Sequence, residues 1–295
     1  LNFLLIPAVI FVMWWGTVKP FFESLKVIQI LTIIQQQDFS SALDKSRELF
    51  KSPSFIRGEA RNNLTREFIG QVDLSKIKEN QSVVDYGLFM ADELQKGLAE
   101  SPLDFRYYLS LCNLYNFFGP ADSEYFKKSE EIARRASEIF PRNIDVLFKI
   151  FNGRMQQNDL AGAEAVLDEV LQKASNSHLA HWYQGVIYFN QKKFELAQAE
   201  VDKAISLGYP YQGRLTNIVF LAGIQMNLGN FSKALEYYFD ALKLSPRDVQ
   251  LHADIASAYY QMGDKAKAKE WVLKILEINS ALKSKVDEFL QTIGE

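Results

Sequence analysis

The chain has 295 residues, of which 48% are hydrophobic and 23% are charged, so it has the composition of a folded protein of one large or two ordinary domains and not of a disordered one. Its formal net charge is −3, and no basic stripe is visible, which argues against a nucleic-acid-binding protein. The single cysteine, Cys112, excludes an internal disulfide.

The chain opens with an uncharged apolar segment. Fourteen of the first eighteen residues are apolar, and Lys19 is the first charged residue. Eighteen residues in a helix span about 27 Å, close to the ~30 Å hydrocarbon core of a bilayer. Trp14 and Trp15 then stand at one end, as in an interfacial aromatic belt. We predict that residues 1–18 form a transmembrane helix, and because the chain starts with Leu1 instead of Met, we expect this helix to be truncated.

Three alternatives compete with a transmembrane helix. A signal peptide is disfavoured because no basic stretch and no small-x-small cleavage site precede Lys19. A buried core helix would usually have a polar face. The third alternative, a monotopic anchor that lies in the membrane interface without crossing it, is compatible with the sequence. The charges of Lys19, Glu23 and Lys26 lie on one flank only, so they do not fix the membrane orientation.

Residues 20–100 are predicted to form a helical linker with a degenerate repeat. The stretch "QQDFSSALDKSRELFKSP" echoes the repeats found further along the chain, and we interpret residues 27–53 as the degenerate unit. A second helix is expected to begin near Ser54. The polar connector 72–80 is the expected hinge, and residues 82–100 form a longer helix with apolar positions three and four residues apart.

Residues 104–280 repeat themselves. The blocks "NDLAGAEAVLDEVLQKAS", "KKFELAQAEVDKAISLGY", "GNFSKALEYYFDALKLSP" and "GDKAKAKEWVLKILEINS" share an alanine in the sixth place: Ala163, Ala197, Ala234 and Ala268. These alanines are separated by 34, 37 and 34 residues, and another helical stretch precedes each block. An earlier copy begins with "YLSLCNLYNFFG". We therefore predict five helix–turn–helix repeats, followed by a capping helix over residues 281–295.

The regular spacing of small residues along the chain has a physical reason. The alanines let two helix backbones approach closely, and Gly185, Ala222 and Ala256 do the same from the preceding helix. Gly229 and Gly263 stand at the tight turns, where a positive φ favours glycine.

This pattern resembles the tetratricopeptide repeat (TPR) family, whose consensus reads W-x2-L-G-x2-Y…G-x-Y-x2-A…P. Single copies depart from it: Arg154 and Gln225 stand where tyrosine is usual, and Trp182 is one place late. The resemblance implies an all-α fold, an α-solenoid of TPR helix pairs, here preceded by one N-terminal transmembrane helix. It also implies an interaction module.

Residues 1–70 add a second resemblance. An apolar helix, then "ALDKSRELF" and "SFIRGEARNNLTREF", resemble the C-terminal end of bacterial O-antigen ligase or polymerase family membrane proteins. This implies a membrane-anchored tail in envelope polysaccharide assembly, with the repeats outside the cytoplasm and the reacting residues of a glycan ligase or polymerase upstream. The alternative is a stand-alone membrane-anchored TPR adaptor that binds a peptide. About ten further apolar spans upstream of Leu1 would favour the ligase.

We predict no catalytic residue, no cofactor and no metal site in this chain. His178 and His181 are three residues apart on a predicted helix, but no cysteine or carboxylate completes a ligand set, so a surface or packing role is favoured. Cys112 takes the small-residue place of its repeat, which indicates packing.

The predicted binding site is the concave groove lined by the first helix of each repeat. The TPR register places the following residues there: Asn113, Asn116, Phe117, Phe148, Asn152, Gln156, Trp182, Tyr183, Phe189, Asn190, Phe220, Asn227 and Tyr260. Amides pair with an extended peptide backbone, and aromatic rings stack on peptide side chains or sugar faces. The expected partner is therefore a protein or peptide, with a glycan as a second option. Each aromatic is equally compatible with packing, and the group Trp182, Tyr183 and Phe189 is expected to form an exposed patch.

Overall fold

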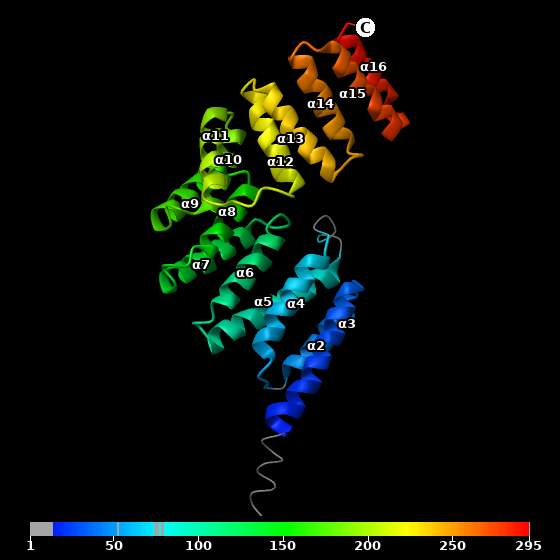
Figure 1. Ribbon diagram of the computed structural model, residues 1–295. Helices are drawn as coiled ribbons and strands as arrows, with labels where there is room; N and C mark the ends of the chain where they lie inside the picture. Colours follow the sequence, from blue (N-terminus) through cyan, green and yellow to red (C-terminus); the bar gives the residue numbers. More distant parts are fainter. Residues whose placement is uncertain (1–13, 52, 74–76, 78–79, 295) are drawn as a thin grey trace, which may run out of the picture. The chain divides into compact units, whose positions relative to one another are not determined.

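The structure is a computed structural model that describes residues 14–51, 53–73, 77 and 80–294 (Figure 1). Residues 1–13, and with them most of the predicted transmembrane helix, lie outside the described residues. A π-helical turn at Trp14–Val18 leads into the first α-helix. Within the described ranges, no helix is long and apolar enough to cross a bilayer.

The chain folds as two compact units, residues 1–174 and residues 175–295, and this division falls inside the expected repeat array. The helices of the first unit follow one another as pairs: α2 (Lys19–Gln35) with α3 (Phe39–Lys51), α4 (Arg57–Gln71) with α5 (Gln81–Glu100), α6 (Phe105–Phe118) with α7 (Glu124–Ile139), and α8 (Asp145–Gln156) with α9 (Leu160–Lys173). The first helices of the pairs, α2, α4, α6 and α8, contact one another in that order and form one layer.

The second unit continues the same construction. Its pairs are α10 (His178–Asn190) with α11 (Phe194–Ser206), α12 (Leu215–Asn227) with α13 (Phe231–Leu244), and α14 (Val249–Gln261) with α15 (Lys265–Ile278). A 3-10 turn at Ser280–Leu282 and helix α16 (Lys283–Thr292) then pack against α15. Val286 is the buried residue of α16, and most of the remaining surface of that helix is polar.

The tight turns within the pairs need a left-handed residue. Gly229 and Gly263 have φ of 75° and 81°, as predicted from the sequence. Asn158 and Lys192 take the same conformation at the corresponding turns, with φ of 56° and 61°. The turn geometry therefore recurs even where the glycine is missing.

Small side chains lie where the helices cross, which confirms the prediction from the repeat. The four alanines of the blocks are fully buried: Ala163, Ala197, Ala234 and Ala268. A Cβ atom added to Gly185 would lie 2.6 Å from Cγ2 of Val201 and 3.2 Å from the backbone oxygen of Ala197. The two helices α10 and α11 can therefore approach this closely only because residue 185 has no side chain.

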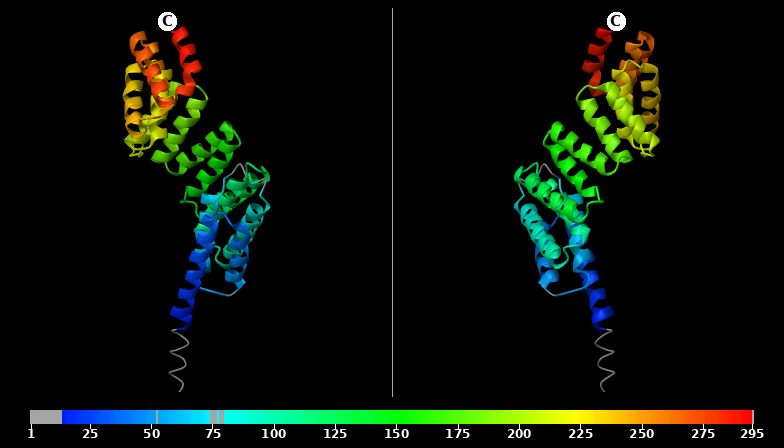
Figure 2. Two further views of the ribbon diagram at one scale, coloured as in Figure 1. Left: turned by 90° about the vertical axis from the view of Figure 1, so that its right-hand side faces the viewer. Right: turned by 90° about the vertical axis from the view of Figure 1, so that its left-hand side faces the viewer.

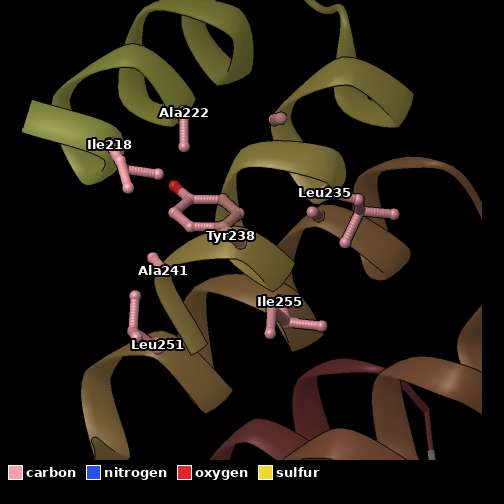
Figure 3. Close-up of a cluster of buried hydrophobic side chains, with 9 residues drawn as sticks. Ile218, Ala222, Leu235, Tyr238, Ala241, Leu251 and Ile255 are labelled. Carbon is pink, nitrogen blue, oxygen red and sulfur yellow. The ribbon is translucent and has the colours of Figure 1, made fainter. Parts of the chain in front are cut away.

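Larger side chains fill the space between neighbouring pairs. In the second unit the ring of Tyr238 on α13 lies among side chains from α12, α13 and α14 (Figure 3): Ile218, Ala222, Leu235, Ala241, Leu251 and Ile255. Burial raises the pKa of the Tyr238 hydroxyl, since the charged phenolate would lose its hydration there.

Helices α4 and α5 form a complete pair, which the sequence interpretation of residues 20–100 as a linker with one degenerate unit missed. Gly87 on α5 lies against both neighbouring helices: a Cβ atom there would lie 3.3 Å from Cε1 of Phe68 on α4 and 2.2 Å from Cζ of Phe118 on α6. The pair is also joined by a buried ion pair, in which Arg61 on α4 lies 3.2 Å from Glu93 on α5 and 2.7 Å from Glu100. A buried charge is tolerated only with such partners.

Replacing Gly185 by alanine should test the close helix crossing. We expect Gly185→Ala to lower the free energy of unfolding by about 1–3 kcal/mol, because the added methyl group overpacks the crossing. Urea denaturation measures this change. Gly223→Ala on α12 is the matched control, since its new Cβ would lie no closer than 3.5 Å to Phe189. That variant should be neutral or more stable by up to ~1 kcal/mol, because alanine favours helix. Equal destabilisation by both changes would contradict the proposed crossing.

Candidate functional site

The first unit contains a groove of about 920 Å³ between the first helices of three consecutive pairs. It is bordered by α4, α6 and α8 and by the loop after α6. Its lining residues are Glu59, Asn62, Asn63, Thr65, Arg66, Ile69, Arg106, Leu109, Ser110, Asn113, Asn116, Phe117, Pro120, Asn152, Met155 and Gln156. The groove is therefore rich in side-chain amides, with a few apolar and charged groups.

Several amides of the groove are available to a ligand. In the described part of the chain, no hydrogen-bond partner is found for the side chains of Asn113, Asn152 and Gln156, and all three are exposed. Asn62, in contrast, accepts a hydrogen bond from the hydroxyl of Ser110 at 2.6 Å and donates to the backbone oxygen of Gly58 at 3.0 Å. The free amides thus belong to α6 and α8.

Asn116 connects these two helices from below the groove surface. Its side chain is only 6% exposed, and its Nδ2 donates to the backbone oxygen of Lys149 on α8 at 2.7 Å. Its Oδ1 has no partner among the described residues. Gly153 provides the space for this amide, since a Cβ there would lie 3.2 Å from Oδ1.

Charged side chains gather where α4 and α6 begin. Arg106 donates to Oε2 of Glu59 at 3.1 Å and to Oδ2 of Asp104 at 2.7 Å. The hydrogen bonds from the Arg106 side chain hold the pKa of the Asp104 carboxyl below its ordinary value. Arg66, about two turns after Glu59 on α4, donates to Oδ1 of Asn63 at 2.9 Å. The charged end is therefore organised largely by its own ion pairs.

The structure places most of the predicted first-unit residues together. Five of them line the groove: Asn113, Asn116, Phe117, Asn152 and Gln156. Phe148 is buried and is not among the lining residues. Sequence reasoning missed the whole α4 wall, whose residues include Asn62, Asn63 and Arg66. The signal was present in "EARNNLTRE", but it needs α4 to be recognised as the first helix of a pair.

The exposed aromatic patch predicted around Trp182 is wrong. Trp182 is only 3% exposed, and its ring stacks on Tyr209 with centroids 4.1 Å apart. Tyr209 belongs to the longer loop between α11 and α12, and its ring lies against His178 and Trp182 in the first half of α10. Tyr183 and Phe189 are half-buried and pack against the same core cluster. These rings therefore stabilise the second unit.

The other predicted binding residues of the second unit also bond or pack against their own chain. Asn190 and Asn227 are exposed, but each donates to the backbone oxygen four residues earlier in its own helix, at 2.8 Å in both cases. Phe220 packs edge-on against Trp182, with centroids 5.4 Å apart. Tyr260 lies 6.1 Å from the ring of Phe289 on α16.

The histidines and the cysteine take structural positions. His181 uses both ring nitrogens, since Nδ1 lies 2.6 Å from Glu200 and Nε2 lies 3.1 Å from the backbone oxygen of Ser175. The ring of His178 packs edge-on against Tyr209. Cys112 is fully buried, as predicted. Among the side chains that the structure describes, no three histidine, cysteine, aspartate or glutamate residues gather as a metal site.

Comparisons with known proteins agree with the repeat pattern. Tetratricopeptide repeat family models match residues 148–209 and residues 220–281. A TPR repeat-containing protein from Methanocaldococcus jannaschii is 24% identical over 178 residues, which cover 56% of this chain but only 30% of that protein. The chain therefore matches less than a third of the length of that relative.

Among solved structures, the chain is similar to YrrB, described as a TPR protein with an unusual peptide-binding site. The TM-score is 0.53 at 16% sequence identity, and the match covers 66% of this chain and 98% of YrrB. A structure of MamA protein gives a TM-score of 0.48 at 19% identity, covering 59% of this chain and 94% of that one. At these identities the likeness to YrrB shows the fold alone.

Trp182 should behave as a core residue in mutagenesis. We expect Trp182→Ala to lower the free energy of unfolding by about 3–5 kcal/mol, because it leaves a cavity beside Tyr209. Denaturant unfolding followed by circular dichroism measures the loss. Asn190→Ala on the same helix should stay within about 0.5 kcal/mol of the parent chain, since this side chain is exposed. A Trp182→Ala variant as stable as the parent would refute the core assignment.

Proposed function

Because residues 148–209 and 220–281 are tetratricopeptide repeats, we propose that this chain is an interaction scaffold and that the groove between α4, α6 and α8 binds an extended peptide. The observation that supports this most is the set of unpaired amides on adjacent helices: Asn113, Asn152 and Gln156.

A peptide backbone offers alternating N–H donors and C=O acceptors. A side-chain amide has both kinds of group, so amides presented from α6 and α8 can bond an extended backbone largely independently of its sequence. The apolar lining residues Ile69, Leu109 and Met155 can take an apolar side chain of the peptide. Arg66, for which no carboxylate partner is found among the described residues, favours an acidic residue of the peptide.

The groove favours a peptide over a glycan. Proteins commonly hold sugars by stacking the ring face on an exposed aromatic side chain. Phe117 is the aromatic residue among the described lining residues, and it is buried against Phe68 and Phe118 with ring centroids 5.7 and 5.3 Å away. The Phe117 ring therefore packs in the protein core, whereas the amides of Asn113, Asn152 and Gln156 are exposed to solvent.

We also propose that residues 1–18 attach the scaffold to a membrane and that the repeats lie outside the cytoplasm in a bacterial envelope. The support is the uncharged apolar sequence up to Val18 and the resemblance of residues 1–70 to O-antigen ligase or polymerase family proteins. In this proposal the scaffold serves envelope polysaccharide assembly. A stand-alone membrane-anchored adaptor is the alternative, and it would use the same groove.

Peptides selected from a random library on the purified chain provide a direct test. We expect Asn113→Ala and Asn152→Ala each to weaken binding of a selected peptide about fivefold, the cost of roughly one hydrogen bond. Isothermal titration calorimetry measures the affinities. Both side chains are exposed, so the variants should keep the circular dichroism spectrum and melting temperature of the parent.

The matched controls are Asn190→Ala and Asn227→Ala, exposed amides on the first helices of second-unit pairs. They should leave the affinity unchanged. Weaker binding by the second-unit variants, with no effect of Asn113→Ala or Asn152→Ala, would contradict the proposed groove.

A further inference from the structure

Helix α2 is apolar on two opposite faces. One face packs into the first unit through Val27, Ile30 and Ile34. The other face is exposed and carries large apolar side chains at helical spacing, which continue from the preceding π-helical turn: Trp14, Trp15, Phe21, Phe22, Leu25 and Ile28. An exposed apolar patch of this size marks an interaction surface.

Two loops bring further exposed apolar side chains to the same end of the unit. Phe55, in the loop between α3 and α4, is 76% exposed, and Leu103, in the loop between α5 and α6, is 75% exposed. These are the most exposed large hydrophobic side chains of the described residues. Both residues lie in loops between helices, and the rest of the described chain leaves most of each side chain exposed.

Hydrogen bonds fix the loop of Phe55 beside the start of α2, which lies at the lower end of the first unit in Figure 1 and Figure 2, and ion pairs fix the end of α5, just before Leu103, beside the start of α4. Lys19 donates to the backbone oxygen of Pro53 at 2.9 Å, and the hydroxyl of Ser54 bonds Glu23. The end of α5 is held against the start of α4, since Glu100 lies 3.8 Å from Arg57 and 2.7 Å from Arg61.

We propose that this end of the first unit rests on a lipid bilayer, with Phe21, Phe22, Phe55 and Leu103 in the boundary between the headgroups and the hydrocarbon. Phe21 and Phe22 follow closely on the uncharged segment 1–18, and Phe55 lies in the loop that is bonded to Lys19 and Glu23 at the start of α2. A tryptophan pair followed by Lys19, whose Nζ lies 4.0 Å above the ring of Trp15, is the arrangement found at membrane interfaces.

The charges at this end predict which lipids are needed. The cationic groups of Lys19, Arg57 and Arg106 each lie within 4 Å of a carboxylate of this chain. With Lys51 as the exposed lysine at the end of α3 for which no ion pair is found among the described residues, little positive charge is left to attract anionic lipids. The contact should depend on apolar insertion and should form on phosphatidylcholine alone.

This inference rests on the proposed membrane attachment of residues 1–18 and is independent of peptide binding. To test it, Phe55→Cys and Leu103→Cys are labelled with the environment-sensitive fluorophore NBD, and the chain is reconstituted with phosphatidylcholine vesicles. Cys112 should stay unlabelled, because it is fully buried and burial raises the pKa of its thiol to about 12. Leu196→Cys, at an exposed leucine of α11 in the second unit, is the matched control.

We expect a blue shift and a several-fold rise of NBD emission at residues 55 and 103 on the vesicles, with quenching by lipids that carry bromine in the acyl chains and no change at residue 196. Chains that float with the vesicles but show no change at residues 55 and 103 would overturn the docking and leave the attachment standing. Chains that do not float would overturn both. A rise without vesicles that grows with protein concentration would show that a second copy covers this end instead.

Discussion

The architecture depends on helices that approach closely at positions with almost no side chain. In the second unit, Gly185 lies against Ala197 and Val201, where any larger residue would separate α10 from α11. In the first unit a glycine allows a close approach between successive pairs, as Gly87 of α5 faces the ring of Phe118 of α6. The first helices of successive pairs lie side by side, and residues of α4, α6 and α8 line one groove.

The two units use this common frame differently. In the first unit the amides of α6 and α8 stay unpaired and the groove stays open. In the second unit Asn190 and Asn227 bond their own helices, and Tyr209 covers Trp182. Burying that tryptophan adds stability, whereas the exposed amides of α6 and α8 bond water, which a ligand can replace. Our proposed recognition site therefore lies in the first unit, and the aromatic residues Trp182 and Tyr209 belong to the core of the second unit.

Regular parts of the fold were predictable from sequence because each depends on local periodicity. The recurring alanines predicted the helix pairs, and the TPR register predicted that Asn113 and Asn152 share a surface. The helices expected from near Ser54 and over residues 82–100 are present as α4 and α5, but their association as a pair was not predicted because a long connector separates them. The burial of Trp182 was missed because it depends on Tyr209, which lies in an irregular loop that no repeat register describes.

The central claim is that the layer of α4, α6 and α8 in the first unit is the recognition surface. Photo-crosslinking tests it most directly: a library-selected peptide that contains benzoylphenylalanine is irradiated with the full chain, and the adducts are mapped by mass spectrometry. The account predicts adducts within Arg57–Gln71, Phe105–Phe118 and Asp145–Gln156. Adducts confined to the second unit, or to the opposite helices α5 and α7, would contradict it.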